Sequence, residues 1–126
     1  MLGNMTDTAV KRVLIVDDDA SLLEALERGL EYHGLDVVAH GTFEAARRAL
    51  RTDSFDALLT DVRLGAFNGL HLAVDARNSQ PDIRIVVFSG FDDPVLRSEA
   101  EHIGALYVVK PVTAEQLTRH LSIVQQ

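Results

Sequence analysis

The sequence contains no cysteine, which excludes disulfides, thiolate catalysis and cysteine-ligated metal sites. No apolar run approaches the roughly 18 residues that a membrane-spanning helix needs. Residues 1–12 have no apolar core of the kind that directs secretion. From these absences we expect a soluble cytoplasmic protein that makes no contact with membranes.

Basic residues are also scarce. The 12 lysines and arginines are outnumbered by 19 aspartates and glutamates, and the net charge is −7. Because nucleic-acid binding draws on a basic surface, we do not expect this domain alone to bind DNA or RNA. The chain has 126 residues, 47% of them hydrophobic, so it fits a single domain with a substantial core.

Five short apolar segments recur along the chain, and four of them are nearly continuous rather than alternating. Strands that are buried on both faces have this pattern. Helical patterns lie between and after the segments, so the order is (βα)₅, which predicts a parallel sheet with helices on both faces. The predicted strands are 13–16, 37–39, 57–60, 85–88 and 106–109.

Residues typical of helix ends mark the predicted helices. The expected signals are a capping box from Ser21 to Glu24, a stop at Gly34, a cap at Thr42, a cap at Asp93 with Pro94 after it, and a capping box from Thr113 to Gln116. Asp19 is expected either to begin the first helix or to support a site at the strand end.

Charged and polar residues follow four of the predicted strands. Asp17 and Asp18 follow the first, Asp61 the third, Ser89 the fourth and Lys110 the fifth. The carboxyl ends of parallel strands meet at one edge of a sheet, where ligands bind, so these side chains should converge. Two carboxylates ~5 Å apart repel by about 3 kcal/mol at an effective dielectric of ~20, so a cation is expected among them.

The residue types predict the chemistry of this edge. Clustered carboxylate oxygens suit a hard divalent cation, above all Mg²⁺. A hydroxyl and a lysine beside a metal suit a phosphoryl group, whose oxygens need donors and positive charge. Asp61 stands alone at the end of its strand and is the best candidate nucleophile.

Four segments, in their order and spacing, resemble the signature segments of response-regulator receiver domains: "VLIVDDDASLLEAL", "DALLTDVRLGAFNGL", "IVVFSG" and "YVVKPVT". The likeness extends from about Lys11 to Val124. It implies an α/β, flavodoxin-like (βα)₅ doubly wound parallel sheet with strand order 2-1-3-4-5, an order known from the family. The receiver domain would span 11–126, after a disordered tail over 1–10.

The resemblance also implies the reaction. Asp61 matches the aspartate that accepts a phosphoryl group from the phosphohistidine of a sensor histidine kinase or histidine phosphotransfer protein. Mg²⁺ would be bound by Asp17, Asp18, Asp61 and the backbone carbonyl of Arg63. The domain would catalyse only its own phosphorylation and dephosphorylation, and so is better described as a signalling module than as an enzyme.

A switch follows from the same resemblance. Ser89 and Lys110 match the groups that contact the phosphoryl group, Tyr107 matches an aromatic side chain that swings inward on activation, and the bond before Pro111 is expected to be cis. The surface of the fourth helix, fifth strand and fifth helix would then change, and an output domain or target of unknown identity would read it. A homodimer through the fourth helix, common in relatives, stays open.

Two departures from the family pattern bear on the site. Gly65 stands where relatives have proline, so the loop after Asp61 is expected to be less rigid. Arg63 and Phe91 lie two residues beyond Asp61 and Ser89, at positions that tune dephosphorylation in relatives. We hypothesise that these two long side chains shield the phosphoryl group from water.

Other interpretations remain beside this one. Asp17-x-Asp19 is close to the nucleophile motif of haloacid-dehalogenase phosphohydrolases, although Ser21 stands where Thr or Val is usual. An unphosphorylated interaction module with the same fold is a third interpretation. Tyr107 could be an ordinary core residue, and the five histidines show no metal-ligand spacing.

Overall fold

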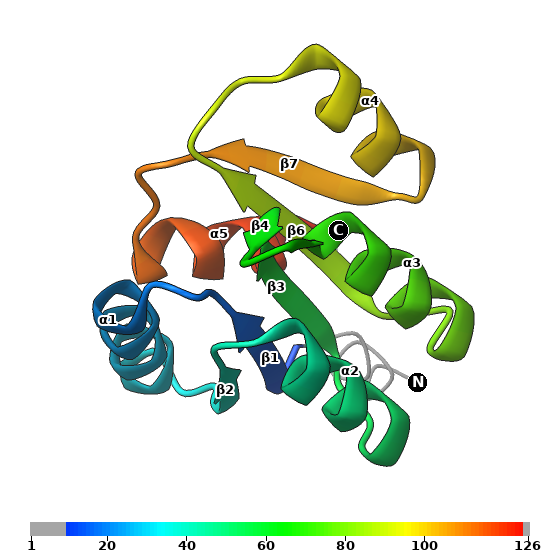
Figure 1. The fold of residues 1–126 in the computed structure, drawn as a ribbon. Coiled ribbons are helices and arrows are strands. Elements are labelled where there is room, and N and C mark those ends of the chain that lie inside the picture. Colours follow the sequence, from blue (N-terminus) through cyan, green and yellow to red (C-terminus); the bar gives the residue numbers. More distant parts are fainter. Residues whose placement is uncertain (1–9, 125–126) are drawn as a thin grey trace.

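The structure is a computed structural model that describes residues 10–124. Its centre is one parallel sheet of five strands with the order β2-β1-β3-β6-β7 (Figure 1). This order is the predicted 2-1-3-4-5, because two short strands outside the sheet take the numbers β4 and β5. Apart from Val10, the predicted tail lies outside the described residues. The five strands are β1 (Arg12–Val16), β2 (Asp36–His40), β3 (Ala57–Asp61), β6 (Arg84–Ser89) and β7 (Ala105–Val109).

Helices cover both faces of the sheet, as Figure 1 shows. On one face α1 and α5 pack against alternate strand residues such as Ile15 and Leu59. On the other face α2, α3 and α4 pack against Leu14 and Leu58. Both sets of strand residues are buried, which explains the nearly continuous apolar runs. The helices are α1 (Ala20–Tyr32), α2 (Phe43–Thr52), α3 (Gly69–Ser79), α4 (Pro94–His102) and α5 (Ala114–Val124).

Most of the predicted helix signals are confirmed. Thr42 and Asp93 cap α2 and α4, and the side chains and backbones of Thr113 and Gln116 exchange the hydrogen bonds of a capping box. The capping box predicted at Ser21 is wrong. The alternative that Asp19 begins the first helix is confirmed, because its Oδ1 accepts hydrogen bonds from the backbone N–H groups of Ser21 and Leu22.

A small hairpin between β3 and α3 was not predicted. Its strands, β4 (Arg63–Leu64) and β5 (Phe67–Asn68), are too short to leave a periodic pattern in the sequence. Gly65 lies in the turn with a φ of +63°, a conformation that favours glycine. Among the described residues, no helix has both the length and the apolarity to span a membrane.

Candidate functional site at the strand ends

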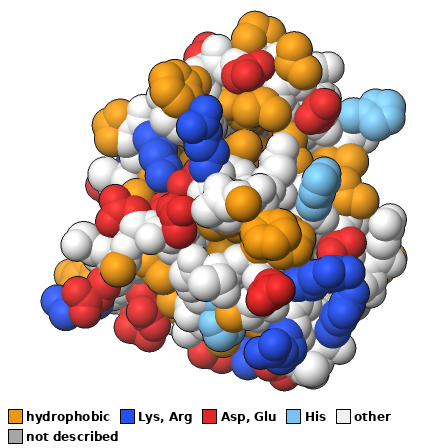
Figure 2. Space-filling model, viewed as in Figure 1, with side chains coloured by type: hydrophobic (Ala, Val, Ile, Leu, Met, Phe, Trp, Pro, Cys, Tyr) orange, Lys and Arg blue, Asp and Glu red, His pale blue; other side chains and the backbone are white. Residues whose placement is uncertain are grey.

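The register of the sheet brings the ends of its strands together. Val16 pairs with Thr60, so the residues after them, Asp17 and Asp61, are neighbours on adjacent strands. Asp61 pairs with Phe88 on the other side. In the view of Figure 2, acidic side chains with basic side chains above them lie left of the centre of the molecule.

Lys110 joins two of the carboxylates. Its Nζ lies 2.9 Å from Oδ2 of Asp61 and 3.3 Å from Oδ2 of Asp17. Asp17 is fully buried, and Asp61 is only 6% exposed. The second oxygen of each carboxylate accepts a backbone hydrogen bond, from the N–H of Asp19 to Asp17 at 2.9 Å and from the N–H of Arg63 to Asp61 at 3.1 Å.

Asp18 completes a group of three carboxylates. One ligand oxygen from each of Asp17, Asp18 and Asp61 can be chosen so that all three lie within 4.8 Å of one another. Oδ2 of Asp18 accepts a hydrogen bond from the N–H of Gly65 at 3.0 Å. Three carboxylates and one ammonium ion leave two negative charges in a small volume. A hard divalent cation fits this donor set, as the sequence predicts.

The pKa values of Asp17 and Lys110 are both shifted upward. Burial raises the pKa of Asp17, and the negative charge of Asp61 raises it further, against the opposing effects of the Asp19 N–H and Lys110. Burial by itself would lower the pKa of Lys110, but its hydrogen bond to Asp61 and the charges of both aspartates raise it overall. The two aspartates therefore favour the charged form of Lys110.

The side chains of Ser89 and Tyr107 form hydrogen bonds with the backbone of Phe91. The Ser89 side chain is buried, and its Oγ accepts a hydrogen bond from the N–H of Phe91 at 3.2 Å. Tyr107 is already directed inward, and its hydroxyl donates to the backbone oxygen of Phe91 at 2.7 Å. Both residues therefore hold the segment that follows β6.

The contact of Arg97 with Tyr107 was missed by sequence reasoning. The Arg97 guanidinium lies 4.9 Å from the centre of the Tyr107 ring and 2.8 Å from the carboxylate of Asp92. The hydrogen bond to Asp92 raises the pKa of Arg97, although burial opposes it. No pattern in the sequence relates a helix residue to a ring on the neighbouring strand, so this contact had no signal.

The two predicted shielding residues contact each other. The guanidinium of Arg63 lies 5.6 Å from the centre of the Phe91 ring, which is 65% exposed. The contact connects the residue two beyond Asp61 with the residue two beyond Ser89. The Lys110–Pro111 peptide bond is cis.

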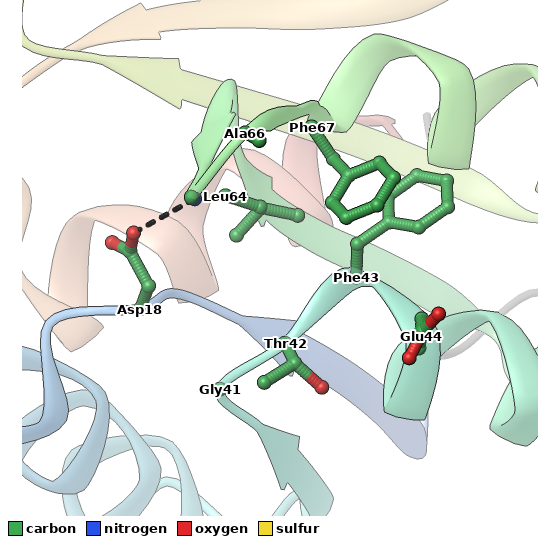
Figure 3. A pocket seen from close by; sticks show the side chains of 9 residues that line it. Asp18, Gly41, Thr42, Phe43, Glu44, Leu64, Ala66 and Phe67 are labelled. Atoms are coloured by element: carbon green, nitrogen blue, oxygen red, sulfur yellow. Dashed lines mark hydrogen bonds between the residues drawn. The ribbon is translucent and has the colours of Figure 1, made fainter.

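A hollow of about 340 Å³ opens beside Asp18 (Figure 3). One wall is the segment from Gly41 to Glu44, and the other is the hairpin from Leu64 to Phe67. The rings of Phe43 and Phe67 stack across it, with centroids 4.9 Å apart and planes inclined by 13°. This stack, too, was missed by sequence reasoning.

The model of the response regulator receiver domain matches residues 13–122, which include every residue of the cluster. This chain belongs to the response regulator receiver domains. Among solved structures, it is similar to a CheY-like receiver domain protein from Methanospirillum hungatei, with a TM-score of 0.86 and 25% identity, covering 93% of this chain and 94% of that one. The family match identifies the fold and the signalling class, and gives the haloacid-dehalogenase interpretation no support.

Curated relatives of this receiver domain are longer proteins. The chain is 32% identical over 107 residues to the alginate biosynthesis transcriptional regulatory protein AlgB of Pseudomonas aeruginosa, covering 84% of this chain and 24% of that protein. It is 33% identical to the acid tolerance regulatory protein ActR of Sinorhizobium medicae, covering 85% and 56%. The chain therefore spans between a quarter and just over half of the length of these relatives.

One further structure bears on the cluster. A response regulator from Burkholderia pseudomallei, solved with a phosphorylated aspartic acid, a calcium ion and citrate, is 30% identical, with a TM-score of 0.82 and coverage of 91% of this chain and 71% of that one. In that protein the same fold holds a phosphoaspartate and a divalent cation.

Proposed function

We propose that Asp61 accepts a phosphoryl group from a phosphohistidine, with Mg²⁺ bound by the carboxylates around it. One observation carries this proposal. A carboxylate oxygen of Asp61 lies within 4.8 Å of one from each of Asp17 and Asp18, and its Oδ2 lies 2.9 Å from Nζ of Lys110. A bond forms between phosphorus and an oxygen of Asp61 as the P–N bond of the donor breaks. The donor is a sensor histidine kinase or a histidine phosphotransfer protein.

The residues around Asp61 have separate roles in this transfer. Asp17, Asp18, Asp61 and the backbone carbonyl of Arg63 would hold Mg²⁺, which neutralises phosphoryl oxygens when bound. Lys110 supplies a positive charge beside Oδ2 of Asp61. The N–H of Arg63 orients the Asp61 carboxylate by donating to Oδ1.

The switch begins with the change of charge at Asp61. A phosphoryl group carries roughly two negative charges and three acceptor oxygens, so it draws in the hydroxyl of Ser89. Ser89 then releases the N–H of Phe91, whose backbone oxygen holds Tyr107. Repacking of Tyr107 alters the surface of α4, β7 and α5, which an output domain or target protein reads.

Phosphorylation with a small phosphodonor tests the proposal. Acetyl phosphate with Mg²⁺ should label the protein stoichiometrically, as measured by intact mass, and chelation of Mg²⁺ should stop the reaction. Asp61→Asn should abolish labelling, whereas Asp82→Asn, at an exposed turn before the start of β6 and so at the opposite end of the strand from the site, should leave it unchanged. A wild-type protein that stays unlabelled while Mg²⁺ is plentiful would favour an unphosphorylated interaction module.

A further inference from the structure

The hairpin of β4 and β5 connects the acidic cluster to α2. At its turn, the N–H of Gly65 donates to Oδ2 of Asp18. At its second strand, Phe67 stacks on Phe43, the first residue of α2. Figure 3 shows both contacts, the hydrogen bond on one side of the hollow and the stacked rings on the other.

The stack on Phe43 explains why an aromatic residue as exposed as Phe67 stands in the hairpin. Phe67 is 50% exposed, whereas Phe43 beneath it is 8% exposed and belongs to the core. An offset pair of rings contributes more free energy of stabilisation than the burial of its surface alone would. The hollow lies between the hairpin and the start of α2, so the stacked rings connect its two walls.

Asp18 depends on the hairpin for its orientation. Its side chain is exposed, in contrast to the buried Asp17 and Asp61. Among the described residues, only Gly65 donates a hydrogen bond to its carboxylate, and the acceptor is Oδ2. An exposed carboxylate without that bond would rotate freely, and holding Oδ2 leaves Oδ1 for another ligand.

We propose that Gly65 and Phe67 are positioning residues for the cation ligand Asp18. The stack on Phe43 fixes the hairpin, and the hairpin N–H fixes the carboxylate. This inference rests on the proposed function, because it assumes that Mg²⁺ binds at the cluster. It assigns Phe67 a part in Mg²⁺ affinity although its ring lies outside the acidic group.

The coupling has to be reciprocal. If the ordered hairpin raises the affinity for Mg²⁺, then bound Mg²⁺ stabilises the hairpin by the same factor. Mg²⁺ should therefore slow hydrogen exchange at the Gly65 amide. It should also protect the amides of β4 and β5 that pair in the hairpin.

Cation selectivity separates positioning from general support of the fold. Mg²⁺ demands nearly ideal octahedral geometry, whereas Ca²⁺ tolerates irregular and longer coordination. A loosened Asp18 should therefore weaken Mg²⁺ binding more than Ca²⁺ binding. A variant that is merely less stable would lose affinity for both cations alike.

The experiment is a titration of the wild-type chain and its variants with MgCl₂ and with CaCl₂, followed by ¹H–¹⁵N spectra. Phe67→Ala should raise the Kd for Mg²⁺ roughly tenfold, the low end of the effect of groups that orient metal ligands. It should raise the Kd for Ca²⁺ no more than about threefold, given the looser geometry that Ca²⁺ accepts. Phe67→Tyr, which keeps the stack, should bind as the wild type does. Tyr32→Ala removes an exposed aromatic from α1 as a matched control and should change neither constant.

Each outcome has a defined meaning. Unchanged Mg²⁺ affinity in Phe67→Ala, or an equal loss for both cations, overturns the positioning role and leaves the proposed function intact. Absence of Mg²⁺ binding by the wild type overturns the proposed function itself. If Phe67→Ala fails to fold, exchange of the wild-type Gly65 amide decides the matter, because a rate that Mg²⁺ does not change contradicts the coupling.

Discussion

The contact between Arg63 and Phe91 predicts how long a phosphoryl group would stay on Asp61. The guanidinium lies 5.6 Å from the ring centre, and both side chains are exposed. A cation–π contact at an exposed site is worth about 0.5–1 kcal/mol. Such an energy changes the ratio of closed to open arrangements by roughly twofold to fivefold.

Removing either side chain should therefore speed the loss of the phosphoryl group. Water reaches the acyl phosphate in the open arrangement, so Arg63→Ala and Phe91→Ala should each shorten the half-life by roughly twofold to fivefold. The protein is labelled with radioactive acetyl phosphate, freed of donor, and followed by decay of the bound label at constant Mg²⁺.

The double variant tests whether the two residues act as a pair. If the contact itself closes the site, Arg63→Ala with Phe91→Ala should lose label no faster than the quicker single variant, because the contact is broken only once. Arg28→Ala, which removes an arginine from an exposed pair with Glu24 on α1, is the control. Unchanged half-lives in the single variants, or multiplied effects in the double variant, would refute shielding by this contact.

Three further predictions concern stability without Mg²⁺. The pKa of Asp17 is raised in the folded state, so the native protein binds more protons than the unfolded chain between the ordinary and the raised value, and stability falls as pH rises through that window. Asp17→Asn should therefore unfold at a higher temperature than the wild type at neutral pH, and this advantage should shrink in acid. Arg77 donates to four backbone carbonyls at the ends of helices and turns, so Arg77→Ala should lower the free energy of unfolding in urea by roughly 2–3 kcal/mol, whereas the exposed Arg48→Ala should change it little. A Cβ at Gly69 would overlap the backbone oxygen of Asp61, so Gly69→Ala should cost roughly 1–3 kcal/mol in the same urea assay.

The sequence predicts most of the fold because strands that are buried on both faces of the sheet appear as short apolar runs. Runs such as 13–16 and 85–88 read as buried strands, and local caps such as Thr42 and Asp93 depend on bonds to residues two or three positions away. The sequence offers two starting points for α1, because Asp19 and Ser21 both have side chains that can accept N–H groups. Only the start of the helix at Ala20 decides between them.

The contacts that orient side chains in the site leave no such pattern in the sequence. Gly65 and Asp18 are 47 positions apart, and their bond requires the turn of a hairpin whose strands have two residues each. Phe67 would be assigned to an exposed loop by its neighbours in the chain, yet it stacks on the start of α2. Topology predicts that strand ends meet, but the turn of the hairpin decides which oxygen of Asp18 accepts a backbone hydrogen bond.

The balance of charge at the strand ends explains why the cation and the phosphoryl group should depend on each other. Lys110 offsets one of the three carboxylates, and the negative charge of Asp61 adds to burial in raising the pKa of Asp17. A divalent cation would bring the cluster close to neutrality. Adding a phosphoryl group at Asp61 would then restore about one negative charge, whereas adding it without the cation would leave about three. Under the proposed function, phosphorylation before the cation binds is therefore the unfavourable order, and we expect Mg²⁺ to bind Asp17, Asp18 and Asp61 before Asp61 is phosphorylated.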